Sequence, residues 1–97
     1  MITHVVIFRT RNSSVNSEIL AAAKKLAAIE TAESFACGAP CASERPVADD
    51  TFAAAIVVTV KDEAALAEYA NHPVHLDFVE NCLKRHNVKL QVFDIRS

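Results

Sequence analysis

The order in which strand-like and helix-like hydrophobic patterns follow one another constrains the fold of this chain more than any other feature. Four segments show the alternation or the continuous apolar run of a β-strand, namely residues 1–11, 34–38, 51–61 and 88–95. Apolar residues recur at helical spacing between the first two of them and between the last two, over residues 15–29, 62–69 and 72–86. The predicted order is therefore strand, helix, strand, strand, helix, strand, with the second helical region broken in two.

This order predicts an α+β protomer of the ferredoxin-like βαββαβ type, with a four-stranded antiparallel sheet. Strands 1–11 and 51–61 should be central, and the other two should form the edges. The last strand fits an edge, because Lys89 and Gln91 discourage pairing with further chains. Residues 39–50 contain two prolines and two aspartates and should form a loop.

Length and composition exclude several classes of function. The chain has 97 residues, of which 52% are hydrophobic, so we expect one folded domain over residues 1–97. A net charge of -2 gives no general basic surface for nucleic acid, and a single glycine excludes Gly-rich phosphate loops, so no cofactor is expected. No signal peptide or membrane-spanning segment is visible, and the three cysteines are an odd number. We therefore expect a cytoplasmic protein with reduced thiols and no membrane partner.

Both faces of the central strands are apolar. In the third strand one face carries Phe52, Ala54, Ile56, Val58 and Val60, and the other carries Ala53, Ala55 and Val57. Two helices can cover only one face, and an antiparallel sheet with one face in water should alternate apolar with polar residues. We therefore predict a homodimer in which two sheets face each other and form an α/β barrel. The alternative is that small alanines are tolerated on a wet face.

The segment from Tyr69 to His75 carries the residues most suited to chemistry. Pro73 fixes φ and lacks an N–H, so it predicts a helix start with His72 at or near the N-cap and His75 one turn in. Val79, Cys82 and His86 follow His75 at helical offsets. His75 is therefore expected to begin the inward face of this helix.

Histidines and cysteines at short spacing raise two alternatives. His72 and His75 could ligate a metal, but a proline-started turn is poor for chelation and no carboxylate or cysteine pair completes the set, so we predict no metal site. Cys37 and Cys41 are one residue too far apart for a C-x-x-C redox motif. We interpret them as a strand-end residue and a loop thiol, and Cys82 as a small apolar filler.

Several pieces of the chain match one known family. They are residues 1–8 (MITHVVIF), Cys37-Gly38, residues 55–58 (AIVV), residues 68–75 (EYANHPVH) with Phe78 behind them, and residues 92–94 (VFD). On these pieces the whole chain resembles the stress-responsive dimeric α/β-barrel (Dabb) domain family. The resemblance implies ferredoxin-like protomers that pair sheet to sheet.

The family resemblance extends to olivetolic acid cyclase-like polyketide cyclases, which carry out an aldol condensation of a β-ketoacyl thioester without a cofactor. It implies that His4, His75 and Tyr69 are the catalytic residues. Two positions depart from the pattern. A substrate-positioning tyrosine has no counterpart over residues 20–26, and Ala53 stands where many members have aspartate.

Two functional interpretations therefore stand side by side. In the first, a homodimeric domain has a small apolar pocket lined by His4, Tyr69 and His75 that binds a small acyl or aromatic ligand. In the second, an imidazole removes an α-proton from a β-ketoacyl substrate, and another donor stabilises the enolate oxygen. Cofactor-independent oxygenation is a third alternative. In a fourth, the dimer itself is the function and the histidines are inert core groups.

Overall fold

The computed structural model describes residues 1–97 and has the predicted order of elements. They are β1 (Ile2–Arg9), α1 (Asn16–Lys24), β2 (Ser34–Gly38), β3 (Ala54–Val60), α2 (Glu63–Asn71), α3 (Pro73–Phe78) and β4 (Lys89–Arg96). Three short segments flank the helices: η1 (Ser13–Val15) and the 3₁₀ turn η2 (Lys25–Ala28) around α1, and the π-helical segment η3 (Val79–Lys84) after α3. The strands form one antiparallel sheet in the order β2-β3-β1-β4, so the ferredoxin-like fold and the two edge strands are confirmed.

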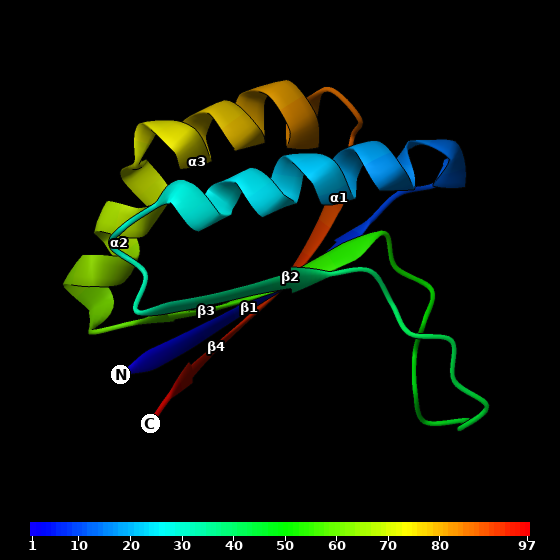
Figure 1. Ribbon diagram of the computed structural model, residues 1–97, viewed down its shortest axis with the longest axis horizontal. Helices are drawn as coiled ribbons and strands as arrows, with labels where there is room; N and C mark the ends of the chain where they lie inside the picture. The colour runs from blue at the N-terminus through cyan, green and yellow to red at the C-terminus, as the bar shows by residue number, and fades with distance from the viewer.

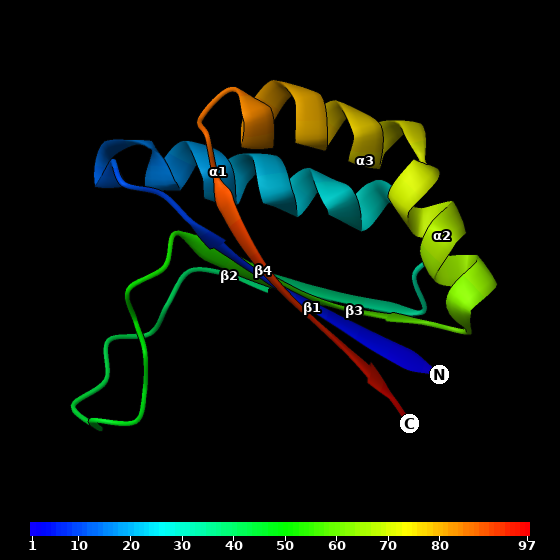
Figure 2. The same ribbon diagram turned by 180° about the vertical axis from the view of Figure 1, so that it is seen from behind.

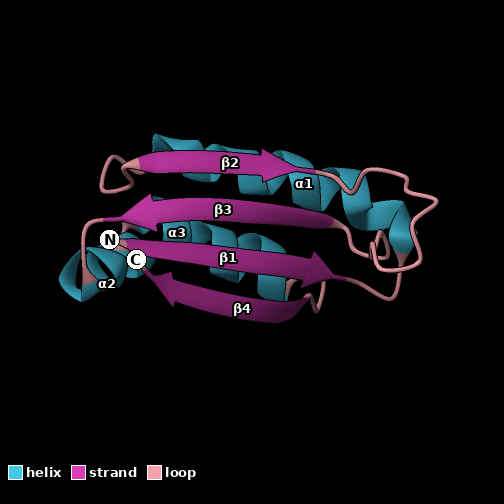
Figure 3. Ribbon diagram, turned by 90° about the horizontal axis from the view of Figure 1, so that it is seen from below, coloured by secondary structure: helices cyan, strands magenta, loops and turns pink.

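The helices lie in one layer on one face of the sheet. α1 and α3 run side by side over the strands, while α2 closes one end of the layer and the β2–β3 loop extends beyond the other end (Figures 1 and 2). Seen from below, the four strands lie in front of all the helices, and no element of this chain covers the outer face of the sheet (Figure 3).

The core lies between these two layers and contains no charged side chain. Its sixteen buried residues are all hydrophobic. From α1 and the turns that follow it come Ile19, Ala23, Leu26 and Ile29, which are at most 2% exposed. The small side chain of Ala23 lets α1 approach the sheet closely.

The start of β3 differs from the prediction. The alternation expected from residue 51 begins only at Ala54. Ala53 precedes β3, and its backbone N–H donates to the carbonyl of Phe8 on the neighbouring strand β1 at 2.8 Å. Ala53 and Ala54 are therefore both buried. Phe52 was expected on the inner face, but it lies beside Ala55 and Val57 on the outer face.

Side-chain caps fix where α2 and α3 begin. The Asp62 carboxylate accepts from the Ala65 N–H at 2.9 Å and caps α2. His72 ends α2 in extended conformation, and its Nδ1 accepts from the Val74 N–H at 3.1 Å, with Pro73 as the first residue of α3. The prediction of a helix start with a His72 cap is confirmed, and the turn that it makes sets the angle between α2 and α3.

The inward face of the last helix does not continue to His86. His75 and Val79 face the sheet, but the His86 Nε2 lies 2.9 Å from a carboxylate oxygen of Glu18 on α1. The prediction assumed the α-helical period from His75 onward. The π-helical segment η3 has more residues per turn, and it turns the following residues toward α1.

Candidate functional site

A cavity of about 210 Å³ lies between the sheet and the helices α2 and α3. Fourteen residues line it, and all but His4 and His75 are hydrophobic. Phe8, Ile56 and Phe78 are among the apolar walls, and Leu26 lines it from the region where the resemblance would place a tyrosine. The structure thus brings His4, Tyr69 and His75 to one small apolar space.

Three elements position these side chains. His4 lies on the inner face of β1, two residues before Val6, and Tyr69 lies in the last turns of α2. The break at His72-Pro73 then lets α3 place His75 beside Tyr69, with ring centroids 5.3 Å apart. The centroid of the His4 ring lies 6.2 Å from that of Tyr69. The phenol therefore packs edge-on against both imidazoles.

Asp94 is a residue of this site that the sequence reasoning did not identify. It lies directly opposite His4 in the β1–β4 pair, and its Oδ1 is 2.5 Å from the His4 Nδ1. Because a carboxylate only accepts, the Nδ1 donates this hydrogen bond, and the carboxylate fixes the orientation of the His4 ring. The sequence did indicate that Asp94 shares a strand face with the apolar residues Leu90 and Val92. Which residue Asp94 meets, however, depends on the register between β1 and β4.

Two polar atoms of the site are buried without a partner. These are the hydroxyl oxygen of Tyr69 and the Nδ1 of His75. Burial raises the pKa of Tyr69 to about 12, with a smaller contribution from the Cys37 thiol, so the phenol stays protonated at neutral pH. Buried polar groups nearly always have hydrogen-bond partners, so two unpaired ones in one cavity are unusual.

Burial also lowers the pKa of His75, and the nearby His4 ring adds to this effect. The backbone of Ala70 acts in the opposite direction, but it forms no hydrogen bond of normal geometry with the Nδ1. Desolvation dominates because a charged imidazolium loses its hydration in an apolar cavity. His75 is therefore a neutral imidazole at pH 7, which is the form that can accept a proton.

The cavity reaches the surface along the edge strand. Leu90 and Val92 line it, and they are 45% and 47% exposed. Apolar side chains of an edge strand thus form one wall between the interior and solvent. A ligand could enter there without unfolding the helical layer.

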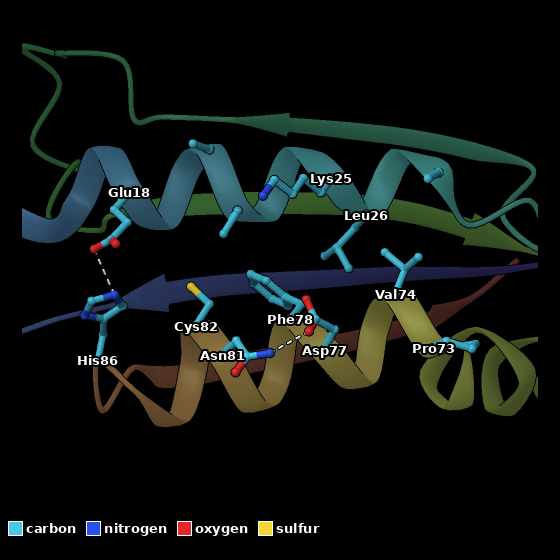
Figure 4. Close-up of a pocket in the computed structure, with 13 residues that line it drawn as sticks. Glu18, Lys25, Leu26, Pro73, Val74, Asp77, Phe78, Asn81, Cys82 and His86 are labelled. Atoms are coloured by element: carbon cyan, nitrogen blue, oxygen red, sulfur yellow. Dashed lines mark hydrogen bonds and ion pairs between the residues drawn. The ribbon is translucent and has the colours of Figure 1, made fainter.

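A second, larger groove of about 660 Å³ lies on the outside of the helical layer, between α1 and α3 (Figure 4). Leu26, Val74 and Phe78 point into it, and Glu18 meets His86 at one end. Asp77 accepts a hydrogen bond from the Asn81 amide along its rim. This groove contains none of the three predicted site residues, and its Cys82 is 4% exposed, as expected for a filler.

The other residues that were considered as metal ligands or redox groups do not line the cavity of His4, Tyr69 and His75. His72 caps a helix, and its Nε2 is 3.7 Å from Glu30. Cys37 lies in β2 and Cys41 in the loop that follows, and both are free thiols. No helix in the structure combines the length and the apolar character that crossing a membrane requires.

Comparison with known proteins agrees with this architecture. The family model described as the stress responsive A/B barrel domain matches residues 2–97. A Dabb family protein with a ferredoxin-like fold from Mesorhizobium loti is 25% identical, with a TM-score of 0.74, and the match covers 99% of this chain and 95% of that one. A search of curated proteins gave no match.

Two further solved structures are similar over nearly the whole chain. A protein of Arabidopsis thaliana is 22% identical with a TM-score of 0.72, covering 100% of this chain and 95% of that one. A dimeric ferredoxin-like protein of unknown function from Thermobifida fusca is 21% identical with a TM-score of 0.74, covering 99% and 90%. At these identities the likeness concerns the fold.

Proposed function

The chain belongs to the stress-responsive A/B barrel domain family, and from this premise we propose that its cavity binds a small, largely apolar molecule. The observation that carries this proposal is the pair of unpaired polar atoms, the Tyr69 hydroxyl and the His75 Nδ1, in an otherwise apolar space. A ligand with one polar group would satisfy them, and its body would fill the apolar remainder.

The volume limits the size of this ligand. At about 210 Å³ the cavity is smaller than the ~300–1,000 Å³ of sites for drug-sized molecules, yet larger than the ~150 Å³ cavity known to accept benzene. A single aromatic ring or a short acyl chain with a carbonyl or hydroxyl group fits these limits. A longer chain would have to extend past Leu90 and Val92 into solvent.

A second candidate function is proton transfer, as in the cyclases that the sequence resembles. The contact between Asp94 and His4 favours it, because a carboxylate that orients an imidazole is a recurrent arrangement in acid–base catalysis. His75 supports it too, since a neutral imidazole in an apolar cavity can accept a proton from a carbon between two carbonyls.

The chemistry would proceed as follows. The neutral His75 takes the α-proton, and the electron pair of the broken C–H bond moves onto the carbonyl as an enolate. The Tyr69 hydroxyl, which has no other partner, donates a hydrogen bond to the enolate oxygen. The enolate carbon then recovers that proton from His75, or it attacks a second carbonyl, whose oxygen takes the proton from His75 and restores the neutral imidazole.

We also propose that the working molecule is a homodimer joined through the outer face of the sheet. Val5, Val57 and Phe93 lie next to one another across the strands of this face, and Phe93 is 49% exposed. A contiguous apolar surface of this kind is rare on a monomer. The Thermobifida fusca protein, which has the same fold, is dimeric, and this supports a dimeric state for the present chain.

NMR of the four imidazoles tests ligand binding directly. Protein labelled at histidine is titrated with phenol, which fits the cavity and carries one hydroxyl group. We expect the His4 and His75 signals to shift together and saturate, while His72 stays unchanged. Tyr69→Phe keeps the shape but removes a donor, so the dissociation constant should rise about threefold to tenfold. Shifts confined to His86 would place the ligand in the outer groove and overturn the proposal.

Deuterium exchange at C2 of ethyl acetoacetate tests the second function. Exchange above the buffer rate that falls in both His75→Gln and Tyr69→Phe would support proton transfer. Exchange that is equal to the buffer rate, or equal in wild type and variants, would leave a binding site without this chemistry.

A further inference from the structure

A cleft of about 530 Å³ at the far end of β1 is lined by cations and by no carboxylate. Arg9 and Arg11 approach it from the end of β1, and Lys89 from the start of β4. His86 and the amide side chain of Asn87 complete the wall where the last helix turns into β4. This concentration of positive charge stands out in a chain whose net charge is -2.

The strand register brings two of these charges face to face. Arg9 and Lys89 are direct partners in the β1–β4 pair. Like charges directly opposite each other on antiparallel strands repel and destabilise the pairing. A bound anion would remove this repulsion.

Carboxylates and carbonyls of the protein neutralise only part of this positive charge. Arg9 pairs with Asp49 at 3.0 Å and also donates to the Thr51 carbonyl at 3.1 Å. Arg11 and Lys89, however, form no ion pair and no side-chain hydrogen bond. His86 is held by Glu18, so the cleft presents two free permanent cations beside one that is fixed in place.

We propose that this cleft binds the phosphate group of a small ligand, with Arg11 and Lys89 as its direct partners and Arg9 as the fixed cation behind them. A concave surface lined by charge of one sign concentrates its field and attracts ions of the other sign. Guanidinium groups form forked hydrogen bonds with phosphate oxygens, and a lysine supplies a further charge. The site is separate from the His4 cavity, and it does not depend on the function proposed for that cavity.

The phosphate could belong to a free inorganic anion or to an ester with an apolar body. Phe8 and Leu90 line the His4 cavity, and the next residues, Arg9 and Lys89, line the cleft but point to the opposite face of the sheet, because side chains alternate along a strand. The apolar body of an ester would therefore have to pass the edge of β4 to reach the cavity. Titration with inorganic pyrophosphate and with phenyl phosphate distinguishes the sources. Signals of His4 that move only with phenyl phosphate would indicate an ester that reaches the cavity.

The test is a pyrophosphate titration of the full-length protein, followed by calorimetry and by the His86 NMR signal. We expect saturable binding that weakens as salt screens the cleft. Arg11→Gln and Lys89→Gln should each raise the dissociation constant about fivefold, which is the effect of losing one exposed charge partner. Both residues are exposed and unpaired, so the variants should fold, which circular dichroism checks.

Lys61→Gln is the matched control. It removes the same charge from an exposed position after β3, at the opposite end of the sheet. Binding should not change in this variant. No saturable binding to wild type, an equal loss in Lys61→Gln, or pyrophosphate shifts at His75 rather than at His86 would each overturn the proposal.

Discussion

At the scale of single residues, Tyr69 and His75 each lower the stability of the protein without ligand. Each has a polar atom that has left water without gaining a partner, which costs about 1–3 kcal/mol in a buried site. A purely structural core would place apolar side chains there. This cost is the physical reason for the proposal that they serve ligand binding rather than stability.

Tyr69→Phe should therefore not destabilise the protein. The substitution keeps the ring that fills the core and removes only the unpaired hydroxyl, so the free energy of unfolding should stay the same or rise by about 1 kcal/mol. Urea denaturation measures it. A loss of more than about 1 kcal/mol would mean that the hydroxyl is hydrogen-bonded in the free protein.

The lowered pKa of His75 predicts a pH dependence of stability. Below its usual pKa of 6.5 the unfolded chain takes up a proton that the folded protein resists, so the free energy of unfolding should decrease as pH falls from about 6.5 toward 5. His75→Gln should flatten this slope and leave the stability difference between the two proteins constant above about pH 7.5. Equal slopes in both proteins would show that His75 is not desolvated.

At the scale of elements, the junction of α2 and α3 builds the site. Tyr69 comes before it and His75 after it, and the His72-Pro73 turn sets their separation. The position of Tyr69 also depends on where α2 begins, because a helix that frays at its start loosens the turns that carry the phenol. The Asp62 cap at the start of α2 therefore helps to hold Tyr69 in place near the other end of the same helix.

Asp62→Ala should lower the free energy of unfolding by about 1 kcal/mol, because the Ala65 N–H loses its side-chain partner. Asp50→Ala is the control, since Asp50 is an exposed aspartate in the loop without an ion pair. Thermal and urea unfolding of the three proteins give the comparison. Equal losses in both variants would assign the effect to charge rather than to the cap.

At the scale of the whole molecule, the uncovered sheet face decides the assembly. The helices stabilise one face of the sheet, whereas Val57 and Phe93 remain 40% and 49% exposed on the other (Figure 3). A second copy would bury both without any change to the protomer. Phe93 and Ile95 of β4 would gain this cover, at 49% and 56% exposed, whereas Leu90 and Val92 of the same strand line the inner cavity and would not.

Val57→Glu should convert the dimer into a monomer, since two carboxylates would be buried near each other at the centre of the interface. Leu76→Glu places the same charge at an exposed apolar residue of α3, on the helical side, and should remain dimeric. Sedimentation velocity distinguishes the two states. A wild-type protein that is monomeric at micromolar concentration, or a Val57→Glu variant that stays dimeric, would contradict this prediction.

Much of the fold and part of the site could be predicted from local patterns. Apolar periodicity predicted the elements and the central position of β1 and β3, and Pro73 predicted the helix start that carries His75. The predictions were wrong at two places where the number of residues per repeat of the backbone changes. The strand alternation starts at Ala54 rather than at Thr51, and the π-helical segment η3 turns His86 away from the sheet.

The sequence by itself determined the order of the elements, the apolar character of both sheet faces and the helix start that places His75 on an inward face, because each of these follows from spacing within one segment. Only the tertiary structure decided that Asp94 meets His4, that two polar atoms stay unpaired, and that Arg9 faces Lys89 across two strands. The first and the last of these features join residues about eighty to ninety positions apart, and the register between distant strands is set by the way that the whole sheet packs.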